Sequence, residues 1–224
     1  MSAQRRAVGG LTTGANYTWS HCISDNTSLG NNIGGLAFTY LDPNDREFDR
    51  GNCESDRRHS FNLTGVVETP SFSRPALRAI ASGWRIAGIY RNTSGSYMTI
   101  LGGQDRALSG VGNQRAEQVL GDPYLDRDGL NFLNPAAFAQ PAPGSLGNMR
   151  RNNIEGPGNW QIDTAISRLF PIGASRLEFR AEAFNLTNRL IRLNPNTNLS
   201  QNVFGQITAA GDPRIMQFAV KYVF

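Results

Sequence analysis

The strongest constraint in this sequence is an alternation of apolar and polar side chains with a period of two residues. Successive side chains of a β-strand point to opposite faces of a sheet, so the alternation predicts strands with one apolar and one polar face. Strongly helical windows are scarce. Five of the predicted strands are residues 11–23, 59–69, 159–170, 176–188 and 214–224. A sixth begins at Gly83, and its alternation fails near Ser94 and Gly95, where we expect a β-bulge.

The composition narrows the fold class further. Hydrophobic residues make up 39% and charged residues 18% of the chain, whereas helical bundles and coiled coils are rich in Ala, Glu, Lys and Leu. Aromatic residues at 9%, spread along the chain, argue against disorder. The basic residues are almost all arginines and are dispersed, with no cluster denser than Arg57-Arg58 or Arg150-Arg151. We therefore expect no nucleic-acid partner.

The connections between the predicted strands alternate in length. Residues 24–58, 102–158 and 189–213 are long and polar, whereas residues 70–82 and 171–175 are shorter. No apolar run is long enough for a transmembrane helix, but a transmembrane strand needs only about 9–11 residues. Long loops on one side and short turns on the other are typical of outer-membrane barrels.

Two environments could receive the apolar faces: a second protein layer in a soluble sandwich, or lipid around a barrel. Lipid is favoured by charges of both signs on the polar faces, which suit a wet lumen: Arg85, Asp163, Glu178, Arg180, Glu182 and Lys221. The aromatic residues also fit two membrane-interface belts. One belt would hold Trp19, Phe61 and Trp160, and the other Trp84, Phe170, Tyr222 and Phe224.

The predicted fold is therefore all-β: an antiparallel transmembrane β-barrel segment of about six strands, an open sheet in isolation, with long extracellular loops. The alternating strand directions place the C-terminus in the periplasm and the long loops outside. Arg168, which falls on the apolar face, is expected near a wet edge.

Several motifs, taken in order along nearly the whole chain, resemble the C-terminal β-barrel part of a TonB-dependent receptor of the Oar-like group, in the outer membrane. They are residues 17–25 (YTWSHCISD), 49–63 (DRGNCESDRRHSFNL), 134–138 (NPAAF), 147–158 (GNMRRNNIEGPG), 179–188 (FRAEAFNLTN) and 214–224 (RIMQFAVKYVF). The ending also resembles the outer-membrane assembly signal that the barrel-insertion machinery reads. Its positions would be Met216, Phe218, Val220, Tyr222 and Phe224.

The resemblance implies a barrel of about 22 strands, of which these residues would be the last. The plug, the TonB-contacting segment and the N-terminal strands of the family would be missing, so that the sequence reads as a fragment. Six strands cannot close a barrel, and an open edge in lipid leaves costly unpaired backbone groups. The expected partners are outer-membrane lipid, the remaining strands and plug, the insertion machinery, and TonB only through the missing part. The chain alone would not perform energised transport, and its substrate is unidentified.

Cys22 and Cys53 flank the first long loop, at equivalent ends of two predicted strands. Paired strand ends bring two Cα atoms within the distance that a disulfide needs, and an outward loop lies in oxidising surroundings. We therefore predict a disulfide. His21 and His59 lie near these cysteines, but the spacing matches no usual zinc site.

The sequence contains only weak indications of a metal site or a catalytic site. Asp122, Asp126, Asp128 and Gly129 resemble half of a calcium loop, and a second acidic cluster comprises Asp42, Asp45, Glu47 and Asp49. Solvated acidic loops are the default interpretation of both. No nucleophile–base motif, phosphate loop or cofactor signature occurs, so neither an enzyme nor a cofactor is expected.

Two alternatives to the receptor segment stay open. The first is a secreted, soluble β-sandwich module that binds glycans. The second is an oligomeric surface protein, porin-like or adhesin-like, assembled from several chains.

Overall fold

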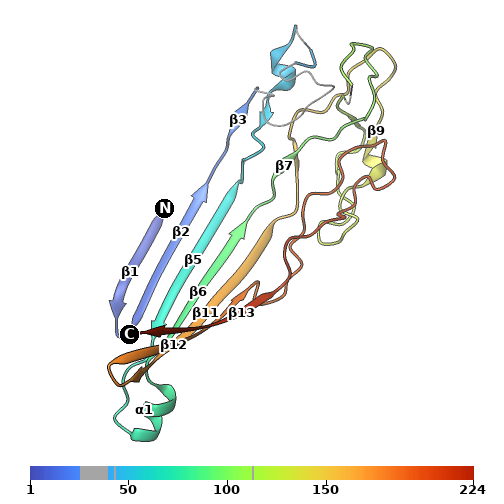
Figure 1. Ribbon diagram of the computed structural model, residues 1–224. Coiled ribbons are helices and arrows are strands. Elements are labelled where there is room, and N and C mark those ends of the chain that lie inside the picture. The colour runs from blue at the N-terminus through green and yellow to red at the C-terminus, as the bar shows by residue number, and fades with distance from the viewer. Residues whose placement is uncertain (26–39, 43, 113) are drawn as a thin grey trace.

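The computed structural model describes residues 1–25, 40–42, 44–112 and 114–224, with the side chains of residues 6–8 left aside. Its main element is a seven-stranded antiparallel sheet in the order β1-β2-β5-β6-β11-β12-β13 (Figure 1). The strands are β1 (Ser2–Val8), β2 (Leu11–Trp19), β5 (His59–Glu68), β6 (Trp84–Thr93), β11 (Asn159–Ile172), β12 (Ser175–Phe184) and β13 (Ile215–Val223). In the described residues β1 and β13 do not pair, so the sheet is open, as predicted.

All six predicted segments lie in this sheet, and a seventh strand, β1, was not predicted. Its residues do not alternate, and its pairing with β2 shifts register between Arg5 and Val8. The strand is instead positioned by a tight turn at Gly9 and Gly10, whose φ angles are 66° and 85°. Because the turn and not an alternating pattern positions β1, the period-two criterion does not detect this strand.

Besides shifts of one or two residues, the structure departs from the predicted strands at three places. β2 stops at Trp19, and the chain pairs again as β3 (Ile23–Ser24) against β4 (Gly51–Asn52). The bulge expected near Ser94 and Gly95 is wrong: the chain leaves the sheet after Thr93 and continues as β7 (Tyr97–Met98) against β10 (Ile154–Glu155). Gly95 permits this path, because a Cβ atom there would lie 1.9 Å from the carbonyl oxygen of Gly156.

The third difference is at the end of β12. The predicted strand 176–188 stops at Phe184, and a turn follows in which Asn185 and Asn188 have a φ of 50°. Asparagine tolerates this left-handed conformation better than most residues. The short connection 70–82 contains a helix, α1 (Pro75–Ala81), which begins with a proline at its first position.

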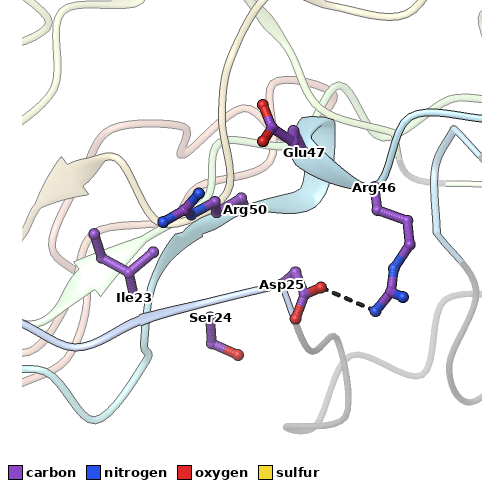
Figure 2. Close-up of a pocket in the computed structure, with 6 residues that line it drawn as sticks. All are labelled: Ile23, Ser24, Asp25, Arg46, Glu47 and Arg50. Atoms are coloured by element: carbon purple, nitrogen blue, oxygen red, sulfur yellow. Dashed lines mark hydrogen bonds and ion pairs between the residues drawn. The ribbon is translucent and has the colours of Figure 1, made fainter.

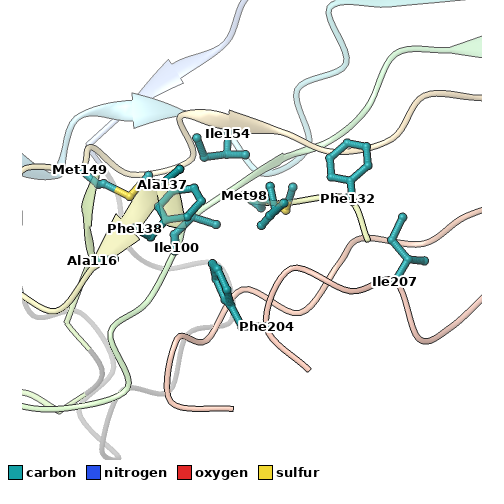
Figure 3. Close-up of a cluster of buried hydrophobic side chains, with 11 residues drawn as sticks. Met98, Ile100, Ala116, Phe132, Ala137, Phe138, Met149, Ile154, Phe204 and Ile207 are labelled. Carbon is teal, nitrogen blue, oxygen red and sulfur yellow. The ribbon is translucent and has the colours of Figure 1, made fainter. Parts of the chain in front are cut away.

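The long connections pack together instead of remaining extended. We call residues 97–112, 114–158 and 189–213 the cap. It contains β7, β10, the pair β8 (Glu117–Gln118) and β9 (Phe138–Ala139), and the 3-10 turn η2 (Pro135–Ala137). Its centre is a cluster of buried side chains (Figure 3): Met98, Ile100, Ala116, Phe132, Leu133, Ala137, Phe138, Met149, Ile154, Phe204 and Ile207. A second 3-10 turn, η1 (Arg46–Asp49), lies in the first long loop.

The cap therefore holds the hydrophobic core of the described chain. It lies at one end of the long strands, whereas α1 and the β11–β12 turn lie at the other end (Figure 1). Among the described apolar residues that are buried, only Ala183 belongs to the seven-stranded sheet. Within the described residues, the sheet itself has no hydrophobic core.

Candidate functional site: the two faces of the sheet

One face of the sheet is apolar across all the strands from β2 to β13. The register places Leu63 opposite Tyr90 and Ile166 opposite Ile86, and Ala181 opposite Phe218. Directly opposite residues point to the same side. Phe218 is 75% and Tyr222 56% exposed, so no described layer covers this face. A soluble sandwich requires such a layer.

Aromatic side chains concentrate at the two ends of the apolar face. At the cap end, Tyr90 contacts both Phe61 and Trp160, with ring centroids 6.1 Å apart in each pair. Trp19 lies at the same end, opposite His59. At the α1 end, Trp84 lies opposite Arg168. Closer to the ends of the same strands, Phe170 lies opposite Leu177, which in turn lies opposite Tyr222. The residues predicted for two belts therefore form two groups at the level of the strand ends.

The opposite face of the sheet is polar, and several of its charges are paired. Arg91 and Gln161 each donate to the carboxylate of Asp163 at 2.5 Å, and the backbone amide of Asn185 donates to it at 2.9 Å. Asp163 is only 6% exposed. Three donors satisfy its oxygen atoms, which is what a buried carboxylate needs. The Asn185 contact also fixes the turn that follows β12.

Further polar contacts cross neighbouring strands on this face. Asn62 donates to Asn16 at 2.9 Å, and Arg85 lies 3.7 Å from Glu68. On the last two strands, Arg180 and Gln217 both bind Glu182. The face thus carries both charge signs in paired contacts, an arrangement that suits a wet interior.

A buried ion pair joins the first long loop to the cap. Arg115 Nη1 lies 2.7 Å from Asp49 Oδ1, and Arg115 Nη2 donates to the Phe48 carbonyl at 2.8 Å. Both side chains are almost fully buried. Burial lowers the pKa of Arg115 below its usual value, and the charge of Asp49 opposes that shift. Asp49 also accepts from the Leu41 amide, so its carboxylate holds the loop in place.

Residues of the two acidic clusters accept hydrogen bonds from the backbone of their own loops. Asp122 accepts from the Tyr124 amide and Asp126 from the Asp128 amide. In the other cluster, Asp42 and Asp45 accept from backbone amides two residues on. Among the described residues, no three His, Cys, Asp or Glu side chains come together in a metal-binding group. Nothing in this geometry supports a calcium site.

The predicted disulfide between Cys22 and Cys53 is present, with Cα atoms 5.4 Å apart. The amide of Cys53 also donates to the carbonyl of Cys22. The two histidines contact aromatic side chains: His59 Nδ1 is 2.7 Å from the Tyr17 hydroxyl, and His21 packs against Trp19. The disulfide closes the base of the first long loop.

A pocket of about 330 Å³ lies within this disulfide-closed loop (Figure 2). It is lined by Ile23, Ser24, Asp25, Arg46, Glu47 and Arg50. Arg46 binds Asp25 at 3.0 Å across it. Its lining combines both charge signs without a nucleophile–base pair, so it suggests no catalytic chemistry.

The predicted C-terminal residues lie together on β13. Met216, Phe218, Val220 and Tyr222 share the apolar face, and Phe224 follows the strand with its ring 6.3 Å from that of Tyr222. No helix in the described part of the chain is long and apolar enough to cross a membrane.

Comparison with known proteins gives one match. The family model described as "Outer membrane beta barrel domain" matches residues 1–217. No curated protein and no solved structure matches the chain significantly.

Proposed function

Because the chain belongs to the family of outer membrane beta barrel domains, and so lies in the bacterial outer membrane, we propose that its sheet is part of the wall of a larger barrel, that of an Oar-like TonB-dependent receptor. The apolar face contacts lipid and the polar face lines the lumen. The receptor takes up a substrate that is not identified.

The open sheet is the observation that carries this proposal. Seven strands with β1 and β13 unpaired leave two rows of backbone N–H and C=O groups without partners in the described residues. Each unsatisfied group in hydrocarbon costs several kcal/mol, so spanning sheets close into barrels. Further strands must therefore pair with both edges. A wall segment without plug or TonB-contacting segment does not perform energised transport by itself.

The cap supports an outward orientation of the long loops. A folded loop layer with its own core at one end of the strands suits a ligand-contacting surface outside the cell, with short turns in the periplasm. The plug and the remaining strands complete the receptor, and TonB acts through that other part. The insertion machinery reads the last strand.

A photo-crosslinking experiment tests the open edge. The residue p-benzoylphenylalanine replaces Ala219 on the edge strand β13, in the bacterium that makes the protein, and mass spectrometry identifies the adduct. Ala165 on β11 is the matched control, because its neighbours on both sides are strands of this chain, opposite Ala87 and Glu182.

The adducts distinguish the candidate assemblies. We expect Ala219 to link to barrel strands from outside residues 1–224, in a polypeptide that also carries a plug. Adducts between identical copies would instead favour the oligomeric porin-like or adhesin-like protein. Only intrachain adducts at both positions, within residues 1–224, would contradict the open edge.

A further inference from the structure

The helix α1 is fixed to the apolar side of the sheet, at the end away from the cap. Trp84 Nε1 donates to the Ile80 carbonyl at 2.7 Å, and Arg168 donates to the Ile80 and Ala79 carbonyls at 3.0 and 2.5 Å. Trp84 and Arg168 lie opposite each other on the apolar face. The apolar face therefore continues directly into α1.

Nothing in the described chain covers α1, and none of its residues is buried. Ile80 is 73% exposed, and Leu77 lies three positions earlier, so the two side chains share one side of the helix. Arg74 and Arg78 are four positions apart on another side. Residues 69–82 contain no acidic residue. The helix is thus amphipathic, and all of its charged side chains are basic.

The side chains around α1 match the chemistry of a membrane interface. The Arg168 guanidinium stacks over Trp84 and Phe170, 5.3 and 4.6 Å from the ring centroids. Tryptophan is enriched at the headgroup level, and arginine extends its charge toward phosphates while its stem stays in apolar surroundings. The ring contacts and the bonds to the Ile80 and Ala79 carbonyls together accommodate Arg168 on the apolar face.

We propose that α1 is an interfacial anchor that binds the phospholipid surface of the leaflet at its end of the barrel wall. Leu77 and Ile80 enter the boundary of the acyl chains, and Arg74 pairs with lipid phosphates. Arg78, whose guanidinium donates to the Phe72 and Ser73 carbonyls, adds its positive charge to the same side. Continuity with the lipid-facing sheet and the basic charge carry this assignment. The inference rests on the lipid-facing role proposed above.

The test measures depth in the membrane. The complete barrel that contains these residues, with its disulfide intact, is purified from the outer membrane and reconstituted into vesicles of phosphatidylethanolamine and phosphatidylglycerol. Bimane is attached in separate variants to Ile80→Cys, Phe218→Cys and Thr208→Cys. Thr208 is an exposed cap residue, so its label is the reference for a site in water. Phe218 lies on the apolar face, so its label is the reference for a site in hydrocarbon. Iodide quenches labels that are exposed to water. Lipids that carry a nitroxide at a shallow or a deep position quench labels at the corresponding depth in the bilayer.

We expect the Ile80 label to be quenched by shallow nitroxides and several-fold less by iodide than the Thr208 label. Equal iodide quenching at Ile80 and Thr208, with deep quenching at Phe218, would overturn the anchor and leave the barrel wall intact. Loss of deep quenching at Phe218 would overturn the lipid-facing role itself.

A charge variant tests the phosphate contact separately. In the Ile80→Cys background, Arg74→Glu should lower the equilibrium constant for the shallow-quenched state by more than about fivefold, because loss of one basic residue near an anionic surface accounts for about fivefold and the new carboxylate is repelled. Arg74→Lys keeps the charge and should change little. Identical quenching in the Glu and Lys variants would overturn the pairing with phosphate.

Discussion

The ion pair of Asp49 and Arg115 shows how single residues hold the cap to the first long loop. A buried charge that loses its partner is left uncompensated. We predict that Arg115→Met lowers the free energy of unfolding of the cap by about 3–5 kcal/mol. The double variant Asp49→Leu/Arg115→Met should recover most of that loss, because no charge is left buried.

Urea unfolding of the protein in detergent measures these differences. Arg150→Met is the control, because Arg150 is exposed in the same region. A single variant at Arg115 that is no less stable than the one at Arg150 would show that the ion pair contributes nothing to the cap.

Tyr124 gives a prediction on pH. Its hydroxyl donates to the Glu155 carbonyl at 3.0 Å within the cap, and burial raises its pKa above the usual 10.0. Folding therefore favours the neutral phenol. The contribution of the Tyr124 phenol to the free energy of unfolding is complete below about pH 10 and is lost as the pH rises through the raised pKa.

The measurement compares cap stability between pH 9 and pH 11 in the original protein and in Tyr124→Phe. We expect the original protein to lose stability more steeply over this window, because the variant has no phenol to ionise. Parallel profiles would show that Tyr124 does not couple to folding.

The sequence predicts some of these residue contacts and not others. Cys22 and Cys53 are predictable because two strand ends flank one loop. The contact between Asp49 and Arg115 is not, because 66 residues separate them and neither lies on a periodic element. The shielding of Asp163 was also missed, since it depends on the turn at Asn185. Only its place on the polar face follows from alternation.

At the level of elements, the strands are predictable where one face alternates with the other. Six segments meet this condition. β1 does not, because its place is fixed by the Gly9-Gly10 turn. The packing of the cap cannot be predicted from the sequence for another reason. Its buried residues are irregularly spaced, so they form no periodic pattern.

The last strand carries an element-scale prediction. If β13 contains the assembly signal, Tyr222→Ala and Phe224→Ala should each lower the amount of protein that assembles in the outer membrane. Val223→Ala is the matched control, because Val223 lies on the other face of the same strand. Urea-resistant membrane protein, normalised to total synthesis, is the measurement. Equal assembly of all three variants would show that the signal lies elsewhere.

The whole molecule inverts the arrangement of a soluble β protein. Its core lies in the cap, and its long strands expose their apolar side chains over a continuous face. In water such a face would drive association or aggregation. In a bilayer it is the stabilising surface, and the paired charges on the other side become the wall of a wet interior. The family of outer membrane beta barrel domains accounts for both faces together.

Two neighbouring residues on β13 test this arrangement of the two faces. Phe218 points to the apolar face and Ala219 to the polar face, in the middle of the same strand. Phe218→Arg should cost about 2–4 kcal/mol, the cost of an arginine near the bilayer midplane, whereas Ala219→Arg should cost far less because its side faces water. The measurement is the unfolding free energy of the outer-membrane protein in lipid vesicles. Both positions are exposed in the isolated chain, so a protein surrounded by water would tolerate both arginines equally. That outcome would exclude lipid as the solvent of the apolar face.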